Sequence, residues 1–205
     1  MVTALALSGC IVAGLAACAP MIIGGAMMGS MIAVDRRTTG TLIEDEGIEL
    51  RAASRIRDNL GDRVHINVTS YNRQMLLTGE VPNAQDRQLV ERVVATVDTV
   101  RSVVNEVAIQ PISTFTQRSS DTLTTGRIKA ALIDAKDLHV NSFKVVTERG
   151  TVYLMGRVTQ REANRATDIV RSIDSVQKVV RVLEIVSEEE LQNLLPKPAA
   201  NEVKK

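Results

Sequence analysis

Few side chains in this 205-residue sequence could support covalent or metal chemistry. It has two cysteines, Cys10 and Cys18, and two histidines, His65 and His139. Both thiols lie near the N-terminus, so no disulfide framework can form in the rest of the chain. Two histidines alone do not complete a structural metal site, and no cysteine is close in sequence to join them. We therefore predict neither a metal site nor a cofactor.

The sequence also lacks the motifs of common enzymes. No glycine-rich phosphate loop follows an apolar strand pattern, and there is no nucleophile elbow. The many Asp and Glu residues could be paired in numerous ways, and no spacing selects one pair. We therefore predict no catalytic residue, and expect a binding protein rather than an enzyme.

The composition argues against several classes of ligand. The chain has 25 Lys and Arg against 24 Asp and Glu, a net charge of +1, which argues against a dedicated nucleic-acid binder. Hydrophobic residues make up 44% of the chain, which argues against disorder. Only 2% are aromatic, so no stacking platform for bases or sugars is expected. The aromatic residues are Tyr71, Phe115, Phe143 and Tyr153.

The N-terminal segment has the pattern of a secretion signal. Residues 1–34 contain no Asp, Glu, Lys or Arg, and residues 1–17 have the length of a signal peptide. The stretch Leu15-Ala16-Ala17-Cys18 resembles the lipobox of bacterial lipoproteins, in which the cysteine sulfur takes a diacylglycerol. Leu7-Ser8-Gly9-Cys10 also matches, but cleavage there would leave too short an apolar region. We predict lipid attachment at Cys18.

The residues that follow Cys18 leave a second interpretation open. Residues 19–34 remain apolar, as in a single transmembrane anchor, although several glycines and Pro20 weaken a long helix. The first residues lack the usual basic charge of a signal peptide, which leaves open a start codon further upstream. Ala19 after the cysteine favours, by resemblance, sorting to the outer membrane. We predict that residues 18–42 form a linker.

The rest of the sequence contains an internal repeat with two copies. Three segments recur in the same order, with changes in spacing only between them. The matching segments are 68–81 with 145–158, 93–100 with 169–176, and 55–60 with 127–132, at shifts of 77, 76 and 72 residues. Two copies indicate two domains rather than a solenoid, which needs three or more repeats.

Each copy predicts the order helix, strand, strand, helix, strand. In the first copy these elements are predicted at 44–60, 65–70, 74–81, 84–97 and 103–109. The second copy is predicted at 121–186, with Asp121 as the N-cap of its first helix. The predicted domains are therefore 43–110 and 121–186, separated by a linker at 111–120 and followed by a C-terminal tail at 187–205.

Glycines are expected at turns, because glycine adopts positive φ at little cost. Gly79, Gly150 and Gly156 are predicted as structural turn glycines. The segments 150–158 and 76–81 that contain them resemble the BON domain, a small αββαβ module of bacterial envelope proteins. With the lipobox, the whole chain resembles dual BON-domain lipoproteins of the Gram-negative outer membrane.

That resemblance implies an α+β fold with two tandem αββαβ domains, each a three-stranded mixed sheet packed against two helices. It also implies a non-enzymatic role in envelope integrity, with anionic phospholipid binding and, in some members, placement at the cell division site.

The first helix of the second copy is the predicted lipid-binding element. At about 100° per residue, one side carries the core positions and the opposite side is apolar with basic flanks. The predicted phospholipid-binding residues are Leu123, Gly126, Arg127, Lys129, Ala130 and Ile133. At the 72-residue shift, the first copy has polar residues on the same side, namely Arg51, Ser54, Asp58 and Gly61. An apolar stripe with cations on its flanks is typical of a helix that lies on a membrane surface.

The charge totals of the two copies favour the same interpretation. Residues 43–109 have 8 basic and 11 acidic residues, whereas residues 117–186 have 12 and 8. We predict an anionic phospholipid membrane, of phosphatidylglycerol or cardiolipin, as the partner, and location on the periplasmic face of the outer membrane.

Two other uses of the stripe remain open, a packing surface between the domains and a solvated face. The alternative function is a periplasmic adaptor for outer-membrane assembly or peptidoglycan-remodelling proteins.

Overall fold

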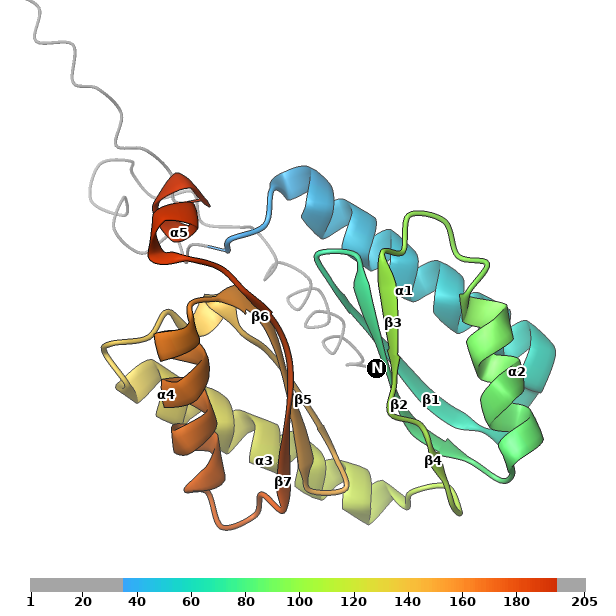
Figure 1. Cartoon of the computed structure of the whole chain (residues 1–205). Helices are drawn as coiled ribbons and strands as arrows, with labels where there is room; N and C mark the ends of the chain where they lie inside the picture. Colours follow the sequence, from blue (N-terminus) through green and yellow to red (C-terminus); the bar gives the residue numbers. More distant parts are fainter. Residues whose placement is uncertain (1–34, 195–205) are drawn as a thin grey trace, which may run out of the picture. The chain divides into compact units, whose positions relative to one another are not determined.

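The computed structural model describes residues 35–194, which are coloured along the sequence in Figure 1. The predicted signal peptide, Cys18 and most of the predicted linker lie outside the described residues, as do residues 195–205.

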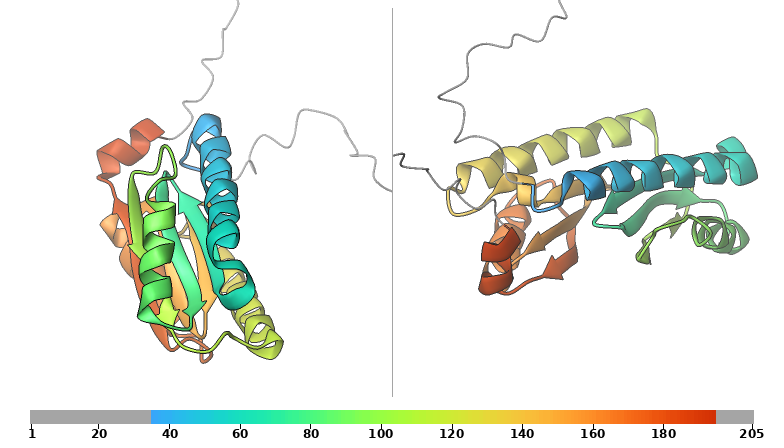
Figure 2. Two further views of the ribbon diagram at one scale, coloured as in Figure 1. Left: turned by 90° about the vertical axis from the view of Figure 1, so that its right-hand side faces the viewer. Right: turned by 90° about the horizontal axis from the view of Figure 1, so that it is seen from above.

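The first copy folds as a mixed sheet covered by two helices. Strand β1 pairs antiparallel with β2, and β3 and β4 pair parallel with β2, one after the other. Helices α1 and α2 lie side by side on one face of this sheet (Figures 1 and 2). The elements are α1 (Thr39–Leu60), the 3-10 turn η1 (Gly61–Arg63), β1 (His65–Tyr71), β2 (Gln74–Val81), α2 (Ala84–Val94), β3 (Ser102–Asn105) and β4 (Ala108–Ile109).

The second copy repeats this arrangement. Its sheet has the order β5-β6-β7, with an antiparallel and then a parallel pairing, and α3 and α4 cover one face (Figure 1). The predicted α+β fold with two αββαβ units is confirmed. The elements are α3 (Phe115–Asp134), the 3-10 turn η2 (Val140–Ser142), β5 (Lys144–Glu148), β6 (Thr151–Val158), α4 (Gln160–Arg171), β7 (Lys178–Ile185) and α5 (Glu188–Leu194).

Successive side chains of the central strands β2 and β6 point to opposite faces of their sheets, and apolar side chains are buried on both faces. In β2, Met75 and Leu77 point to the helices of their own domain, and Leu76 points to the other face. In β6, Leu154 faces the helices, and Met155 faces away. The two away-facing sets meet in a third buried cluster of Tyr71, Leu76, Tyr153, Met155 and Val182. The domains therefore pack through the sheet faces that their helices leave uncovered.

Several element boundaries differ from the prediction. Helix α1 begins at Thr39, before the predicted residue 44, and α2 ends at Val94 rather than at 97. The strand predicted at 103–109 is interrupted between Asn105 and Ala108, because the Asn105 side chain accepts a hydrogen bond from Val107 N at 3.1 Å. Periodicity identifies such elements more reliably than their ends.

A buried aspartate in the first helix of each copy holds the hairpin turn. Asp45 accepts hydrogen bonds from Asn72 N at 2.8 Å and Arg73 N at 2.7 Å. Asp121 accepts them from Arg149 N at 2.8 Å and Gly150 N at 3.0 Å. All four donor residues have positive φ, three of them without being glycine. The carboxylates therefore stabilise turn conformations that are otherwise unfavourable.

The prediction that Asp121 caps the second copy's first helix is wrong. Asp121 is buried inside α3, whose N-cap is Thr114 in a capping box with Gln117. The helix therefore starts within the predicted linker at 111–120.

The shared role of Asp45 and Asp121 also corrects the register of the repeat. These residues are 76 residues apart, whereas the sequence comparison aligned the first helices at a shift of 72. The two alignments differ by about one helical turn, which keeps the same residues on the buried face. Apolar periodicity alone could not tell them apart. At the correct shift Leu123 corresponds to Gly47, and Gly126 corresponds to Leu50.

Two of the three predicted turn glycines lie in strands instead. Gly150 is in the β5–β6 turn with φ 71°, but Gly79 and Gly156 are inside β2 and β6. A Cβ on Gly79 would lie 2.0 Å from the His65 carbonyl oxygen, and one on Gly156 would lie 2.2 Å from that of Ser142. These two glycines permit the close approach of neighbouring backbone at the same place in each domain.

Candidate functional site

The structure places all six predicted phospholipid-binding residues on the exposed side of α3. Leu123 is 65% exposed and Ile133 is 62% exposed, although both are large and apolar. Gly126, Ala130, Arg127 and Lys129 are exposed as well. On the opposite side, Ile128 and Leu132 are fully buried in the domain core. The predicted division of this helix into a core face and an outer face agrees with the side-chain burial.

Phe115 extends the outer face to the first residue of α3. It is 79% exposed, the most exposed of the large apolar side chains in residues 35–194. Phe115 and Ile133 are 18 residues apart, which is five full turns, so they lie on the same side of the helix. We call Phe115, Leu123, Gly126, Ala130 and Ile133 the α3 stripe.

Sequence reasoning missed Phe115 because it started the helix at residue 121. The capping-box spacing of Thr114 and Gln117 is the signal that could have identified the true start.

Two cations lie beside the stripe without acidic partners. At 100° per residue, Arg127 projects on one side of the stripe and Lys129 on the other. Neither side chain makes a salt bridge or hydrogen bond within the part of the chain that the structure describes. Their charges are therefore available to an anion outside the folded unit.

The first helix of the other domain is less polar than predicted. Arg51, Ser54, Asp58 and Gly61 are exposed, as expected. However, α1 also exposes Ile43 and Leu50, by 67% and 73%. The prediction of a polar outer face for this helix is therefore only partly correct, because the 72-residue register omitted Leu50 from the comparison.

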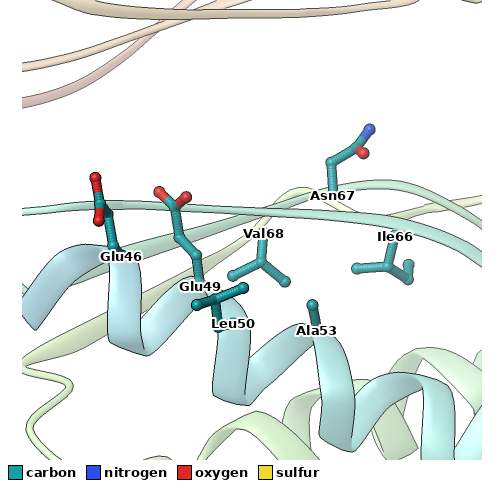
Figure 3. Close-up of a pocket in the computed structure, with 7 residues that line it drawn as sticks. All are labelled: Glu46, Glu49, Leu50, Ala53, Ile66, Asn67 and Val68. Carbon is teal, nitrogen blue, oxygen red and sulfur yellow. The ribbon is translucent and has the colours of Figure 1, made fainter.

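Leu50 has a different electrostatic setting from the α3 stripe. It lines a groove of about 470 Å³ between α1 and β1, with an apolar floor of Ile66 and Val68. Glu46 and Glu49 line the same groove, and Figure 3 shows their carboxylates on the helix next to Leu50. Glu49 also accepts a hydrogen bond from Lys144 Nζ at 2.6 Å. The groove beside Leu50 is therefore edged by carboxylates, whereas Arg127 and Lys129 flank the α3 stripe.

One alternative use of the stripe is now excluded for the folded unit. The domains pack through their sheets at the cluster that contains Leu76 and Met155, and the α3 stripe stays exposed. The interpretation of the stripe as a packing surface between the two domains is therefore wrong.

The segment before α1 is fixed to the second domain by a buried ion pair. Arg36 donates two hydrogen bonds to the Glu162 carboxylate, at 2.7 and 2.8 Å, and one to the Arg157 carbonyl at 2.8 Å. Both side chains are almost completely buried. Burial by itself raises the pKa of Glu162, but the bonds from Arg36 and from Thr159 N outweigh it and lower the pKa below its ordinary value.

A second polar cluster lies where the ends of β1 and β2 meet the end of β5. Glu80 is fully buried and accepts from Arg149 Nε at 2.6 Å, while its other oxygen lies 3.1 Å from His65 Nδ1 and 3.2 Å from Ser113 N. Burial acts to raise the pKa of Glu80, but Arg149, Ser113 and His65 together lower it. The cluster therefore links charged groups of both domains.

Glu148 completes this cluster in a less favourable setting. It is 8% exposed and accepts a hydrogen bond from Asn67 Nδ2 at 2.9 Å. Burial raises the pKa of Glu148, and the negative charge of Glu80 adds to this effect despite the bond from Asn67.

The described residues contain no membrane span of their own. None of the helices within residues 35–194 is both long and apolar enough to cross a bilayer. Attachment through Cys18 remains a prediction, because that residue lies outside the described part.

Comparison with known proteins identifies both domains. The family model described as "BON domain" matches residues 45–111 and 120–187. A Haemophilus influenzae protein named outer membrane lipoprotein DolP is 34% identical over 167 residues, which cover 80% of this chain and 86% of that protein. A 21 kDa hemolysin of Actinobacillus pleuropneumoniae is 30% identical, covering 75% and 80% of the two chains.

A solved structure of CdsD, a type III secretion protein of Chlamydia trachomatis, is also similar. It is 15% identical and has a TM-score of 0.30, and the match covers 75% of this chain and 96% of that one.

The two family matches coincide with the two αββαβ units and together cover most of the described residues. The aligned hairpins, the paired aspartates and the paired strand glycines show that both units follow one plan. This chain therefore belongs to the BON-domain family and carries two BON domains in tandem.

Proposed function

We propose that this chain is a non-enzymatic outer-membrane lipoprotein, anchored by acyl chains on Cys18, whose second BON domain docks on anionic phospholipid through the α3 stripe. The observation that carries the proposal is the exposed row of Phe115, Leu123 and Ile133 between Arg127 and Lys129, whose charges are unpaired within residues 35–194. The Haemophilus influenzae relative is named as an outer membrane lipoprotein, which supports the location. The role is maintenance of the envelope from its periplasmic face.

The expected affinity is low. If each large apolar side chain is partly inserted, it contributes about 1 kcal/mol, and each basic residue near an anionic surface contributes about the same. Three such side chains and two cations sum to about 5 kcal/mol, which corresponds to a dissociation constant below about 1 mM. Such docking is reversible and depends on salt, because its ionic part is screened.

The proposed anchor makes a low affinity sufficient. Two or three acyl chains hold a protein firmly in a membrane. The chain between Cys18 and Asp35 spans at most about 60 Å when fully extended, so the folded unit stays close to the bilayer. Tethering raises the effective concentration of α3 at the lipid surface to about the millimolar range.

The test uses a fragment from Asp35 onward and two matched variants. Titration with phosphatidylglycerol vesicles should shift amide NMR signals within residues 115–133, and phosphatidylcholine vesicles should not. Leu123→Glu should weaken binding about tenfold or more, because it places a charge in the stripe. Leu50→Glu alters a similarly exposed leucine on α1 and should leave binding unchanged.

Two outcomes would reject membrane docking by α3. One is an absence of shifts at low salt. The other is equal loss of binding in Leu50→Glu and Leu123→Glu. An adaptor that uses the stripe for a protein of outer-membrane assembly or peptidoglycan remodelling would then be the better candidate, and crosslinking from position 123 in whole envelopes would test it.

A further inference from the structure

The cluster between the two domains offers three side chains suited to a metal ion. One ligand atom each from His65, Glu80 and Glu148 can be chosen such that all three lie within 4.8 Å of one another. We propose that these three residues bind a divalent transition-metal ion, with Zn²⁺ as the expected occupant. Nothing in this proposal depends on the lipid-docking role of α3.

The spacing requires only small movements of side chains. In a tetrahedral zinc site with nitrogen and oxygen ligands, neighbouring ligand atoms are about 3.3 Å apart. His65 Nδ1 and Glu80 Oε2 are already 3.1 Å apart, and strands β1 and β2 place these residues directly opposite each other. Glu148, at the end of β5, lies within 4.8 Å of the other two ligand atoms and must approach them by up to about 1.5 Å to complete the set.

The balance of charge in the cluster favours a cation. Glu80 and Glu148 are both buried, and the Arg149 guanidinium contacts Glu80 through the oxygen that faces away from His65. Within the described residues, the side-chain donor recorded for Glu148 is the neutral amide of Asn67. Buried carboxylates are usually paired with a charge or bound to a metal. A divalent ion between Glu80 and Glu148 would supply the positive charge that the cluster lacks.

The kinds of donor indicate which ion is expected. Mg²⁺ and Ca²⁺ prefer oxygen ligands alone, whereas imidazole together with carboxylates suits Zn²⁺. The His65 side chain is 24% exposed, so an ion can enter from solvent, and water can take a fourth position. Arg149 and Asn67 would orient the two carboxylates, as hydrogen-bond partners around metal sites commonly do.

The second domain has no equivalent of this site. At the 77-residue shift of the hairpins, His65 corresponds to Ser142 and Glu80 corresponds to Arg157. The prediction of no metal site considered only histidines and cysteines, and the carboxylates come from strands far apart in the sequence. Because Glu148 belongs to the other domain, a bound ion would also join the two domains.

The test is calorimetric titration of ZnCl₂ into the full chain, purified in detergent and stripped of metal with EDTA. We expect one ion per chain and a rise in Tm, because a ligand that binds only the folded state stabilises it. His65→Ala and Glu148→Gln should each weaken binding about tenfold or more. His139→Ala, which removes the other histidine of the chain, is the matched control and should bind normally.

A spectroscopic measurement guards against variants that misfold. Glu148→Gln keeps the size of the side chain and an oxygen that can accept from Asn67, so its circular dichroism should match that of the unaltered chain. X-ray absorption of the zinc-loaded full chain should show one imidazole nitrogen among oxygen ligands. Sulfur ligands would place the ion away from His65, Glu80 and Glu148 and overturn the proposal.

Three other results would overturn the proposal. One is no heat and no change in Tm at about 1 mM Zn²⁺, a concentration at which even weak sites fill. Another is unchanged binding in His65→Ala. The third is Mg²⁺ binding as strong as that of Zn²⁺, which would mean that the imidazole takes no part.

Discussion

The two BON domains share a frame but differ in what they present to their surroundings. In both, a buried aspartate of the first helix holds the hairpin turn, and a strand glycine admits a neighbouring backbone carbonyl. Outside that frame they differ. Leu50 on α1 lies next to Glu46 and Glu49, whereas the stripe that contains Leu123 on α3 is flanked by Arg127 and Lys129, which form no ion pair among the described residues.

The comparison distinguishes positions that stabilise the fold from positions that are free to differ between the domains. Positions that face the domain's own helices are equivalent in type and burial, as Leu77 and Leu154 illustrate. Positions outside the core diverge, as His65 with Ser142 and Glu80 with Arg157 illustrate. The shared plan stabilises each domain. The divergent positions give the first domain His65 and Glu80, its part of the cluster between the domains, and give the second domain its basic, apolar helix.

The largest difference between the domains is expected when the turn aspartates are removed. Asp45→Ala leaves Ser70 Oγ, Asn72 N and Arg73 N without their acceptor, whereas Asp121→Ala leaves two backbone donors. We expect losses in the free energy of unfolding of about 4 and about 2 kcal/mol, respectively, at about 1–3 kcal/mol for each orphaned donor. Urea unfolding of both variants measures this. Equal losses would show that the additional donor held by Asp45 adds no stability.

Truncation of the equivalent core leucines should show no such difference. Leu77→Ala and Leu154→Ala each leave a cavity at a fully buried site that faces the helices. We expect each to cost about 3 kcal/mol, within the usual range for a buried leucine. Calorimetric unfolding of the two variants should give the same change. A difference above about 1.5 kcal/mol would show that the two cores are not equivalent.

Acid should destabilise both domains through buried carboxylates. Burial raises the pKa of Asp45, but hydrogen bonds from Arg73, Ser70, Arg37 and Asn72 outweigh it and lower the pKa below 3.8. A lowered folded pKa gives stability that is fully present above the unfolded value and is lost as pH falls through the folded value. We therefore expect the free energy of unfolding to fall below about pH 4, and to fall less in Asp45→Asn.

The measurement is urea unfolding at a series of pH values. Glu162, with a pKa lowered below 4.5 by Arg36 and Thr159 despite its burial, should give the unaltered chain a second contribution in the same range. If the free energy of unfolding falls equally steeply with decreasing pH in Asp45→Asn and in the unaltered chain, Asp45 does not contribute.

Removal of the aromatic end of the α3 stripe should have the smallest effect. Phe115→Ser deletes an exposed ring, so stability should change by less than about 0.5 kcal/mol. Binding to phosphatidylglycerol vesicles should weaken about fivefold, since partial insertion of the ring contributes about 1 kcal/mol. Ile43→Ser on α1 is the control and should bind as the unaltered chain does. Vesicle flotation at low salt measures both.

The sequence alone was sufficient for the repeat, the order of elements and the buried face of each helix. Apolar residues recur at helical spacing whichever turn is taken as the start, so Ile128 and Leu132 were placed in the core although the register was wrong. The same reasoning placed Leu123 and Ile133 on the exposed side. These features depend on local periodicity, which the sequence records directly.

Features that depend on contacts between distant residues are seen only in the folded structure. Asp121 resembles an N-cap in sequence, and its role as acceptor for Arg149 N and Gly150 N exists only once α3 packs against the hairpin. The same holds for the cluster of Glu80 and Glu148, which joins strands of two domains. Such contacts arise because burial forces polar groups to find partners wherever the fold brings them, and no spacing along the chain encodes that choice.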